Sequence, residues 1–162
     1  MANLNLLKPV VKDLALKLID KSKAAGVDII ITQTLRTHAE QDALYAIGRT
    51  KPGSIVTKAK GGYSLHNWGV AFDFCPVAGG KALWSNLALF KKVGKIGQEL
   101  GLEWGGDWKE FVDLPHFQYC LGYTLEDFRK GKVDWSEFDR KKPDPNAIFA
   151  ALMEYLKRAK NR

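Results

Sequence analysis

The stretch that most limits how this chain can fold is "YSLHNWGVAFDF", residues 63–74, because it places an aspartate inside an apolar run. An unpaired carboxylate in an apolar interior is strongly unfavourable, so it is either compensated or changes its pKa. His66 precedes Asp73 by seven residues, and a turn at residues 67–69 can fold it back toward the aspartate. The sequence therefore predicts a buried strand around Asp73 and a partner that compensates its charge.

The composition fits one compact domain and excludes several classes of protein. A chain of 162 residues with 46% hydrophobic residues can bury a core, and it has no apolar run of the ~18 residues that a membrane span needs. Cys75 and Cys120 lack a CxxC spacing, so we expect two core thiols rather than a disulfide framework or a four-cysteine zinc site. The net charge of +7 predicts attraction to an anionic partner: nucleic acid, an acidic membrane surface or bacterial wall polymers.

Apolar spacing, capping residues and turn residues predict helices that alternate with strands. Pro9 suits the first turn of a helix that Gly26 ends, and Thr37 with Glu40 forms a capping box. The expected helices cover residues 9–25, 37–47 and 86–100 and a further one begins at Thr124, and the expected strands cover residues 27–34, 70–77 and 116–119.

Residues 48–62 contain four glycines and several lysines and arginines without apolar periodicity, which predicts a mobile basic loop that can act as a lid. Strands distributed between helices favour an α+β fold with a small antiparallel sheet flanked by helices. We expect this catalytic domain to cover residues 1–140. A linker, "KKPDPN", and an amphipathic C-terminal helix are expected over residues 141–162.

Two of the three histidines lie in unusual contexts, His66 in "SLHNWGVAFD" and His116 in "VDLPHFQ". Together with Asp73 they can form a three-ligand zinc site with an open fourth position, which is the arrangement of a catalytic zinc, and the dication would compensate the aspartate. Spacing alone favours the simpler interpretation of two core-edge histidines and a salt-bridged aspartate. Asp113, three residues before His116, shifts the balance because catalysis at such a site needs a nearby carboxylate base. That pairing requires a bend near Pro115, which the sequence does not predict.

These motifs together resemble a known family. "SLHNWGVAFD" with "FVDLPHFQ" is similar to the SxHxxGxAxD and (D/E)xxH pair of the VanY- and VanX-like zinc D,D-peptidases, peptidase family M15. "TLRTHAEQ", "LEWGGDW" and "DLPHFQ" resemble the L-alanyl-D-glutamate endopeptidases among phage endolysins and Bacillus wall hydrolases. The similarity runs from about residue 33 to residue 118. It implies the hedgehog/D,D-peptidase-like fold of these zinc enzymes.

The resemblance also implies roles for individual residues. His66, Asp73 and His116 correspond to the ligands of Zn²⁺, and Asp113 to the general base that later protonates the departing amine. Arg36 corresponds to the family arginine that holds the polarised carbonyl or its developing oxyanion.

Four further residues are candidates for lining or binding the substrate. Ser64 matches the motif serine, although a turn residue after the paired glycines is an equal alternative. Gln41, on the helix after Arg36, can position substrate or cap local backbone. Trp104 and Trp108 can wall a groove, but large aromatic side chains more often belong to the core.

The function that the resemblance implies is hydrolysis of the peptidoglycan stem peptide between L-Ala and D-Glu, as in endolysin-type cell-wall lysis. The alternatives are a D-Ala-D-Ala carboxypeptidase and a non-catalytic wall- or nucleic-acid-binding module with a structural zinc. We expect peptidoglycan as partner, no nucleic acid, no membrane and a monomer. The N-terminal "MANLNLLKPVVKDL" lacks a signal-peptide pattern, so we expect synthesis in the cytoplasm and action on the cell wall.

Overall fold

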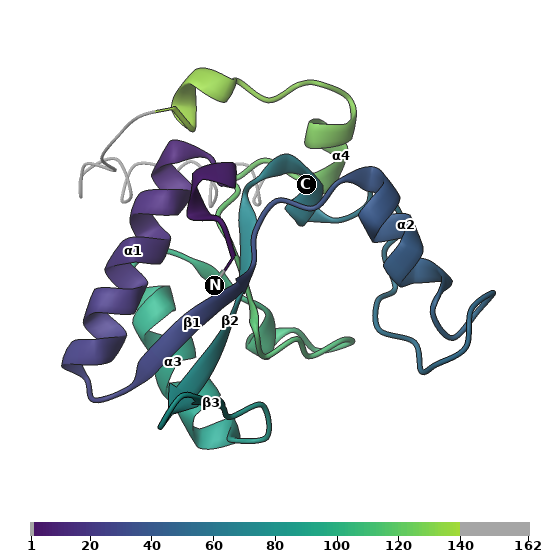
Figure 1. Cartoon of the computed structure of the whole chain (residues 1–162). Helices are drawn as coiled ribbons and strands as arrows, with labels where there is room; N and C mark the ends of the chain where they lie inside the picture. The colour runs from purple at the N-terminus through teal and green to yellow at the C-terminus, as the bar shows by residue number, and fades with distance from the viewer. Residues whose placement is uncertain (1, 140–162) are drawn as a thin grey trace.

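The computed structural model describes residues 2–139. Its centre is an antiparallel sheet with the strand order β1-β2-β5-β4, and a short β3 pairs with β2 beside this path (Figure 1). The strands are β1 (Asp28–Gln33), β2 (Ala71–Ala78), β3 (Lys81–Ala82), β4 (Glu103–Trp104) and β5 (His116–Gln118). The expected α+β fold with a small antiparallel sheet is confirmed.

Residues 2–139 also form four α-helices. They are α1 (Pro9–Ala24), α2 (His38–Ala46), α3 (Leu87–Glu99) and α4 (Leu125–Arg129). The single-turn 3₁₀ helices are η1 (Leu4–Leu6), η2 (Leu65–Trp68), η3 (Gly105–Asp107) and η4 (Trp135–Glu137). In Figure 1, α1 and α3 lie together on one side of the sheet and α2 lies on the other side. The sheet therefore has one covered face, while α2 and the chain after it border the opposite side.

The capping signals in the sequence fix where two helices begin. The Thr37 hydroxyl accepts a hydrogen bond from the backbone N–H of Glu40, and the Glu40 carboxylate accepts one from the N–H of Thr37, so α2 starts at the next residue. The same reciprocal pair, Thr124 with Asp127, opens α4. Both predicted helix starts are confirmed. The expected C-terminal helix lies outside the described residues.

The core forms between the sheet and the helices α1 and α3. Phe72, Phe74 and Phe117 are fully buried on the central strands, and Phe74 packs against Phe117 and against Phe90 of α3. The apolar stripe of α1 lies over the same core. Cys75 and Cys120 are buried and unpaired, as expected. None of the helices between residues 2 and 139 combines the length and apolar character of a membrane span. The central strands β2 and β5 are thus rigidly supported, and these strands carry the site.

Candidate metal centre and catalytic cavity

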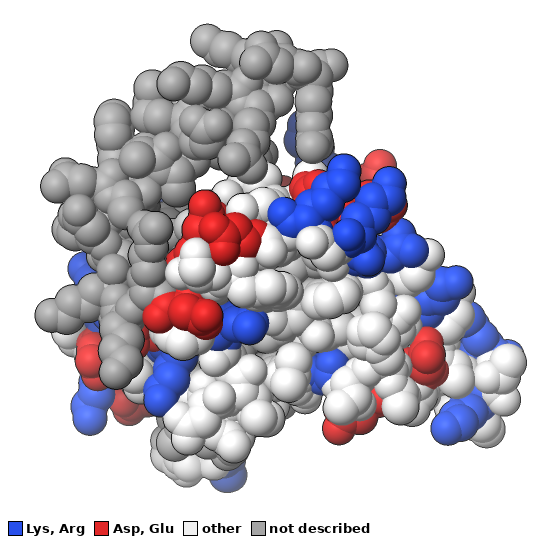
Figure 2. Space-filling model, turned by 90° about the horizontal axis from the view of Figure 1, so that it is seen from above, with Lys and Arg blue, Asp and Glu red and all other residues white. Residues whose placement is uncertain are grey.

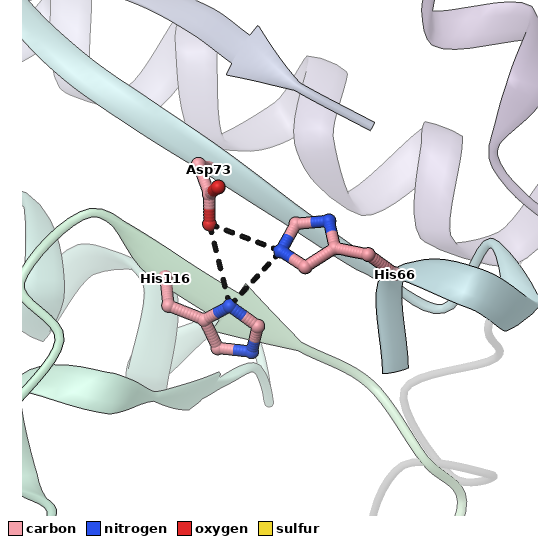
Figure 3. A group of neighbouring side chains, drawn as sticks. All are labelled: His66, Asp73 and His116. Atoms are coloured by element: carbon pink, nitrogen blue, oxygen red, sulfur yellow. Dashed lines mark hydrogen bonds and ion pairs between the residues drawn. The ribbon is translucent and has the colours of Figure 1, made fainter. Parts of the chain in front are cut away.

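Three side chains from separate segments converge on one point (Figure 3). Nε2 of His66 lies 3.1 Å from Oδ1 of Asp73 and 3.2 Å from Nδ1 of His116, and the His116 and Asp73 atoms are 3.3 Å apart. The two histidines are buried, and the carboxylate is about one-fifth exposed, with a side-chain relative exposure of 20%. The structure thus brings together the three residues expected to bind zinc.

Strand pairing delivers two of these residues. β2 and β5 pair antiparallel in a register that sets Asp73 opposite His116, and the backbone N–H of Phe74 donates to the carbonyl of Pro115. Residues directly opposite in an antiparallel pair have side chains close enough to touch on one face. The burial of Phe72 and Phe74 on the other face turns Asp73 toward the cavity.

His66 reaches the same point from the η2 turn that precedes β2. Gly69 ends this turn in a left-handed conformation, with φ of 70°, which a residue with a side chain rarely adopts. The carbonyl of His66 accepts a hydrogen bond from the N–H of Arg36, and the amide of Asn67 donates to the carbonyl of Arg36. The predicted turn is therefore present, and these hydrogen bonds hold it against the segment between β1 and α2.

Hydrogen bonds on the outer side of each ring determine which nitrogen faces the centre. Nδ1 of His66 lies 2.8 Å from the carbonyl oxygen of Thr34, which can only accept, so in the neutral ring Nδ1 carries the hydrogen and Nε2 presents a lone pair. Nε2 of His116 lies 3.1 Å from Oε1 of Gln118. Gln118 is itself oriented, because its amide nitrogen donates to the carboxylate of Glu103 at 2.8 Å. In its neutral form, His116 therefore presents the lone pair of Nδ1 to the same point.

Two lone pairs and a carboxylate oxygen facing one another repel unless a cation or a shared proton lies between them. Zinc bound tetrahedrally at about 2.0–2.1 Å from each ligand would separate the ligand atoms by roughly 3.3 Å, close to the distances seen here. The outer hydrogen bonds to Thr34 and Gln118 are of the kind that orient metal-binding histidines. Within residues 2–139, the cluster of possible metal ligands consists of these three residues and no fourth. The donor set fits a zinc ion with one position left for water or substrate.

The electrostatics of the metal-free centre point in the same direction. Burial alone would raise the pKa of Asp73, but hydrogen bonds from His116 and His66 outweigh it and hold the pKa below its usual value. Burial alone would lower the pKa of His116, but its hydrogen bond to Asp73 and the charge of that carboxylate raise it. The centre thus favours an ionised aspartate with positive charge next to it, and a metal ion would supply that charge.

Asp113 lies at the edge of the same cavity. The N–H of His116 donates to the carbonyl of Asp113, which closes a turn across Leu114 and Pro115. The bend that the sequence could not predict is this turn, and it places Asp113 outside the strand. Burial raises the pKa of Asp113 above its usual value, and of the nearby charges His116 opposes this shift while Asp73 adds to it. Within residues 2–139 no hydrogen bond or ion pair occupies its carboxylate, so it is free to exchange protons.

Gly105 explains why the sequence before this turn is "WGGD". Its carbonyl accepts a hydrogen bond from the N–H of Asp113. A Cβ atom at Gly105 would lie 2.6 Å from the carbonyl oxygen of Asp113 and 3.1 Å from Cβ of His116. The first distance is shorter than any real contact of a Cβ atom and involves the backbone, and the second is tight. Any side chain there would displace the turn that carries Asp113 and His116.

Arg36 extends from the segment before α2 to the cluster of His66, Asp73 and His116. One Nη atom of Arg36 lies 3.6 Å from Oδ2 of Asp73, and the other donates to Oε1 of Gln41 at 2.7 Å. Burial lowers the pKa of the guanidinium and the charges of Asp73 and Asp113 oppose that shift, but an arginine stays protonated in either case. Arg36 therefore presents a fixed positive charge at the cavity.

The cavity has a volume of about 500 Å³. Its lining includes His66, Asp73 and His116 and side chains from the neighbouring segments. Of the residues expected to bind substrate, Ser64 lines this cavity. Trp104 does not: it is buried in the core, and its indole N–H donates to the carbonyl of Leu114. Trp108 lies at the cavity instead, with its ring 5.0 Å from that of His116. Of the two interpretations considered for Trp104, groove wall and core, the structure matches the core, because an apolar ring with a satisfied N–H packs best inside.

Of the two roles considered for Gln41, binding substrate or capping local backbone, its contacts match the second. It is fully buried and does not line the cavity. Its amide oxygen accepts from Arg36, and its amide nitrogen donates to the carbonyl of Ala59. Gln41 thus positions Arg36 and the following loop rather than substrate.

The groups that orient the two histidine ligands were not predicted from the sequence. Gln118 and Glu103 form a relay behind His116, and the carbonyl of Thr34 does the same for His66. The only signal was the position of Gln118 two residues after His116, since alternate residues of a strand share one face.

Replacing Gln118 with leucine should weaken zinc binding by about 10- to 100-fold, the usual effect of losing a residue that orients a ligand. The change removes the acceptor for the N–H at Nε2 of His116. The ring can then also adopt the other tautomer, in which Nδ1 carries the hydrogen and cannot bind the metal. Competition with a chromogenic chelator measures the affinity without requiring activity.

Gln98→Leu is the matched control, since Gln98 is exposed and its side chain bonds, among residues 2–139, to Asp107 on the surface and not to a metal ligand. Equal affinities of the Gln118 variant and this control for zinc would show that the relay does not orient His116.

Comparisons with known proteins agree with this geometry. A family profile described as D-alanyl-D-alanine carboxypeptidase, of the M15 peptidases, matches residues 57–119. The peptidoglycan L-alanyl-D-glutamate endopeptidase CwlK of Bacillus subtilis is 42% identical over 121 residues, which are 69% of this chain and 72% of that protein.

A second relative comes from a phage, and a solved structure shares the fold. The L-alanyl-D-glutamate peptidase of Listeria phage A118 is 33% identical over 159 residues, which are 96% of this chain and 53% of that protein. The L-Ala D-Glu endopeptidase ChiX of Serratia marcescens superposes with a TM-score of 0.54 at 25% identity, over 78% of this chain and 87% of ChiX. With His66, Asp73 and His116 converging beside Asp113 and with this extent of similarity, the chain belongs to the M15 family of peptidases.

Proposed function

We propose that the chain is a zinc peptidase that hydrolyses the peptidoglycan stem peptide between L-Ala and D-Glu. The observation that carries the proposal is the convergence of two imidazole lone pairs and one carboxylate oxygen at 3.1–3.3 Å, beside a free carboxylate on the same cavity. A non-catalytic module with structural zinc is a poorer fit, because structural zinc sites close with four protein ligands.

In this proposal His66, Asp73 and His116 would hold the zinc ion. Zinc in such a site supplies Lewis-acid chemistry, polarising the scissile carbonyl and making water acidic enough to attack at neutral pH. Asp113 takes the proton of the attacking water and delivers it to the nitrogen of the departing amine. Arg36 donates hydrogen bonds to the oxygen that becomes negative during attack, and Gln41 keeps its guanidinium aimed there.

The choice of substrate rests on the relatives and on the charge of the chain. Both curated relatives carry the names of L-alanyl-D-glutamate peptidases. Figure 2 shows lysine and arginine side chains spread over the side of the molecule that bears α2 and α4, with fewer acidic ones among them. Together with the net charge of +7, this favours an anionic polymer such as the bacterial wall.

One alternative has an observation of its own in its favour. The profile that matches residues 57–119 is described as D-alanyl-D-alanine carboxypeptidase. That reaction would use the same metal ligands, the same base and the same arginine. The two activities differ only in the bond that is cut, so the products distinguish them.

Mass spectrometry of purified walls digested by the zinc-loaded protein decides between these reactions. Cleavage of the proposed bond creates new amino termini on D-Glu and leaves L-Ala attached to the glycan. Release of free D-Ala without new D-Glu termini would instead establish the carboxypeptidase. A digest treated with chelator serves as the control, since neither product should form without metal.

The setting proposed for this activity follows from the same reasoning. We propose that residues 1–140 form the catalytic unit, that residues 141–162 are a linker and helix appended to it, and that the protein acts on the cell wall as a monomer, in the manner of a phage endolysin. The phage relative supports action on the wall. This chain spans about half the length of that relative.

A further inference from the structure

Lys58 is a second positively charged residue that lines the cavity, in addition to Arg36. Arg36 is already engaged by Asp73 and Gln41. Lys58 is exposed, and within residues 2–139 no aspartate or glutamate forms an ion pair with it. Its ammonium lies 5.3 Å from the ring centre of Phe111, which also lines the cavity. A positive charge without an acidic partner therefore faces the space where substrate must lie.

Hydrogen bonds to α2 and its C-terminal end fix the backbone that carries Lys58. The carbonyl of Ala59 accepts from the amide of Gln41 at 2.7 Å, and the carbonyl of Thr57 accepts from Arg49 at 3.1 Å. The N–H of Gly61 donates to Asp42 at 2.7 Å. Both neighbours of Lys58 are thus held, so the placement of its backbone beside the cavity is a property of the fold.

Gln41 connects the loop that carries Lys58 to Arg36. Its single amide group bonds to Arg36 through the oxygen and to Ala59 through the nitrogen. Arg36 and the residue after Lys58 are therefore fixed relative to each other by one buried side chain. Both cations therefore line the same cavity.

The proposed substrate carries a matching anion. In the stem peptide D-Glu is joined to the next residue through its side-chain carboxyl, so its α-carboxylate remains free, next to the scissile bond. We propose that Lys58 binds this α-carboxylate and makes the enzyme select acidic over amidated stem peptides. A lysine ammonium is a compact charge that pairs with a carboxylate through charge-assisted hydrogen bonds. This inference rests on the proposed function and adds a subsite to it.

Two soluble substrates that differ in one group test the proposal. Both are N-acetylated L-Ala-γ-D-Glu-L-Lys peptides with an amidated C-terminus, and in the second the α-carboxylate of D-Glu is also an amide. Wild-type enzyme should show a kcat/KM about fivefold higher on the acid, mainly through KM, as expected for a partly exposed charge pair. Lys58→Gln should lose this preference by falling on the acid while its rate on the amide is unchanged. Lys51→Gln, on the same loop but outside the cavity, should behave as wild type.

The outcomes separate this inference from the function on which it rests. If wild-type enzyme cleaves both peptides equally, or if Lys58→Gln keeps the preference for the acid, the α-carboxylate subsite is overturned while the endopeptidase assignment stands. If wild-type enzyme cuts neither peptide but releases D-Ala from a pentapeptide, the endopeptidase function and the subsite both fail.

Discussion

The His116→Ala variant should retain almost no zinc and no measurable peptidase activity. Wild-type protein should contain about one zinc per chain, since the structure offers a single three-residue cluster among the described residues. Removing Nδ1 of His116 leaves two ligands, and the cavity then loses the charge that compensates Asp73. Metal analysis after dialysis, together with wall-lysis assays, measures both effects.

The third histidine provides the control for this experiment. His38 lies at the start of α2, where its ring contacts Trp68 rather than the cluster. His38→Ala should therefore keep its zinc and its activity. The His116 variant should still fold, because the core between the sheet, α1 and α3 does not depend on the metal. A folded His116 variant with a full complement of zinc would refute the proposed ligand set.

Features that depend on nearby residues were predictable from the sequence. The capping boxes at Thr37 and Thr124 act within one helical turn, so each helix start could be located from the sequence. Asp73 was recognisable because a charge within an apolar strand needs a partner wherever that strand lies. The family resemblance added the residues that are distant in sequence, above all His116 and Asp113.

Features that depend on register and close approach were not predictable. Strand β4 has only two residues, too few for a periodic pattern, yet it brings Glu103 beside Gln118. Gly105 carries no signal of the turn it accommodates, because its requirement comes from atoms of Asp113 and His116 eight or more positions away. Trp104 and Trp108 look alike in sequence, and only the packing shows which one reaches the cavity.

Asp113→Asn should separate the base from the metal ligands. Asparagine keeps the size of the side chain and cannot accept the proton of the attacking water, so turnover should fall by about 10²- to 10⁴-fold. Zinc content should stay at the wild-type level, because Asp113 is not part of the cluster formed by His66, Asp73 and His116. Single-turnover rates on a stem peptide carrying L-Ala-D-Glu, measured beside metal analysis, give both quantities from one preparation.

Asp107→Asn is the matched control, since Asp107 is a nearby exposed carboxylate that accepts a hydrogen bond from Gln98 and does not line the cavity. Its turnover should remain close to wild type. If Asp113→Asn hydrolyses the peptide at a near-normal rate, another carboxylate must take the proton: a low turnover of Asp107→Asn would then identify Asp107, and otherwise Glu103 becomes the residue to change. If the variant instead loses its zinc, Asp113 acts through the metal centre rather than as the base. Loss of rate with full zinc content is the result that the geometry of the turn before β5 leads us to expect.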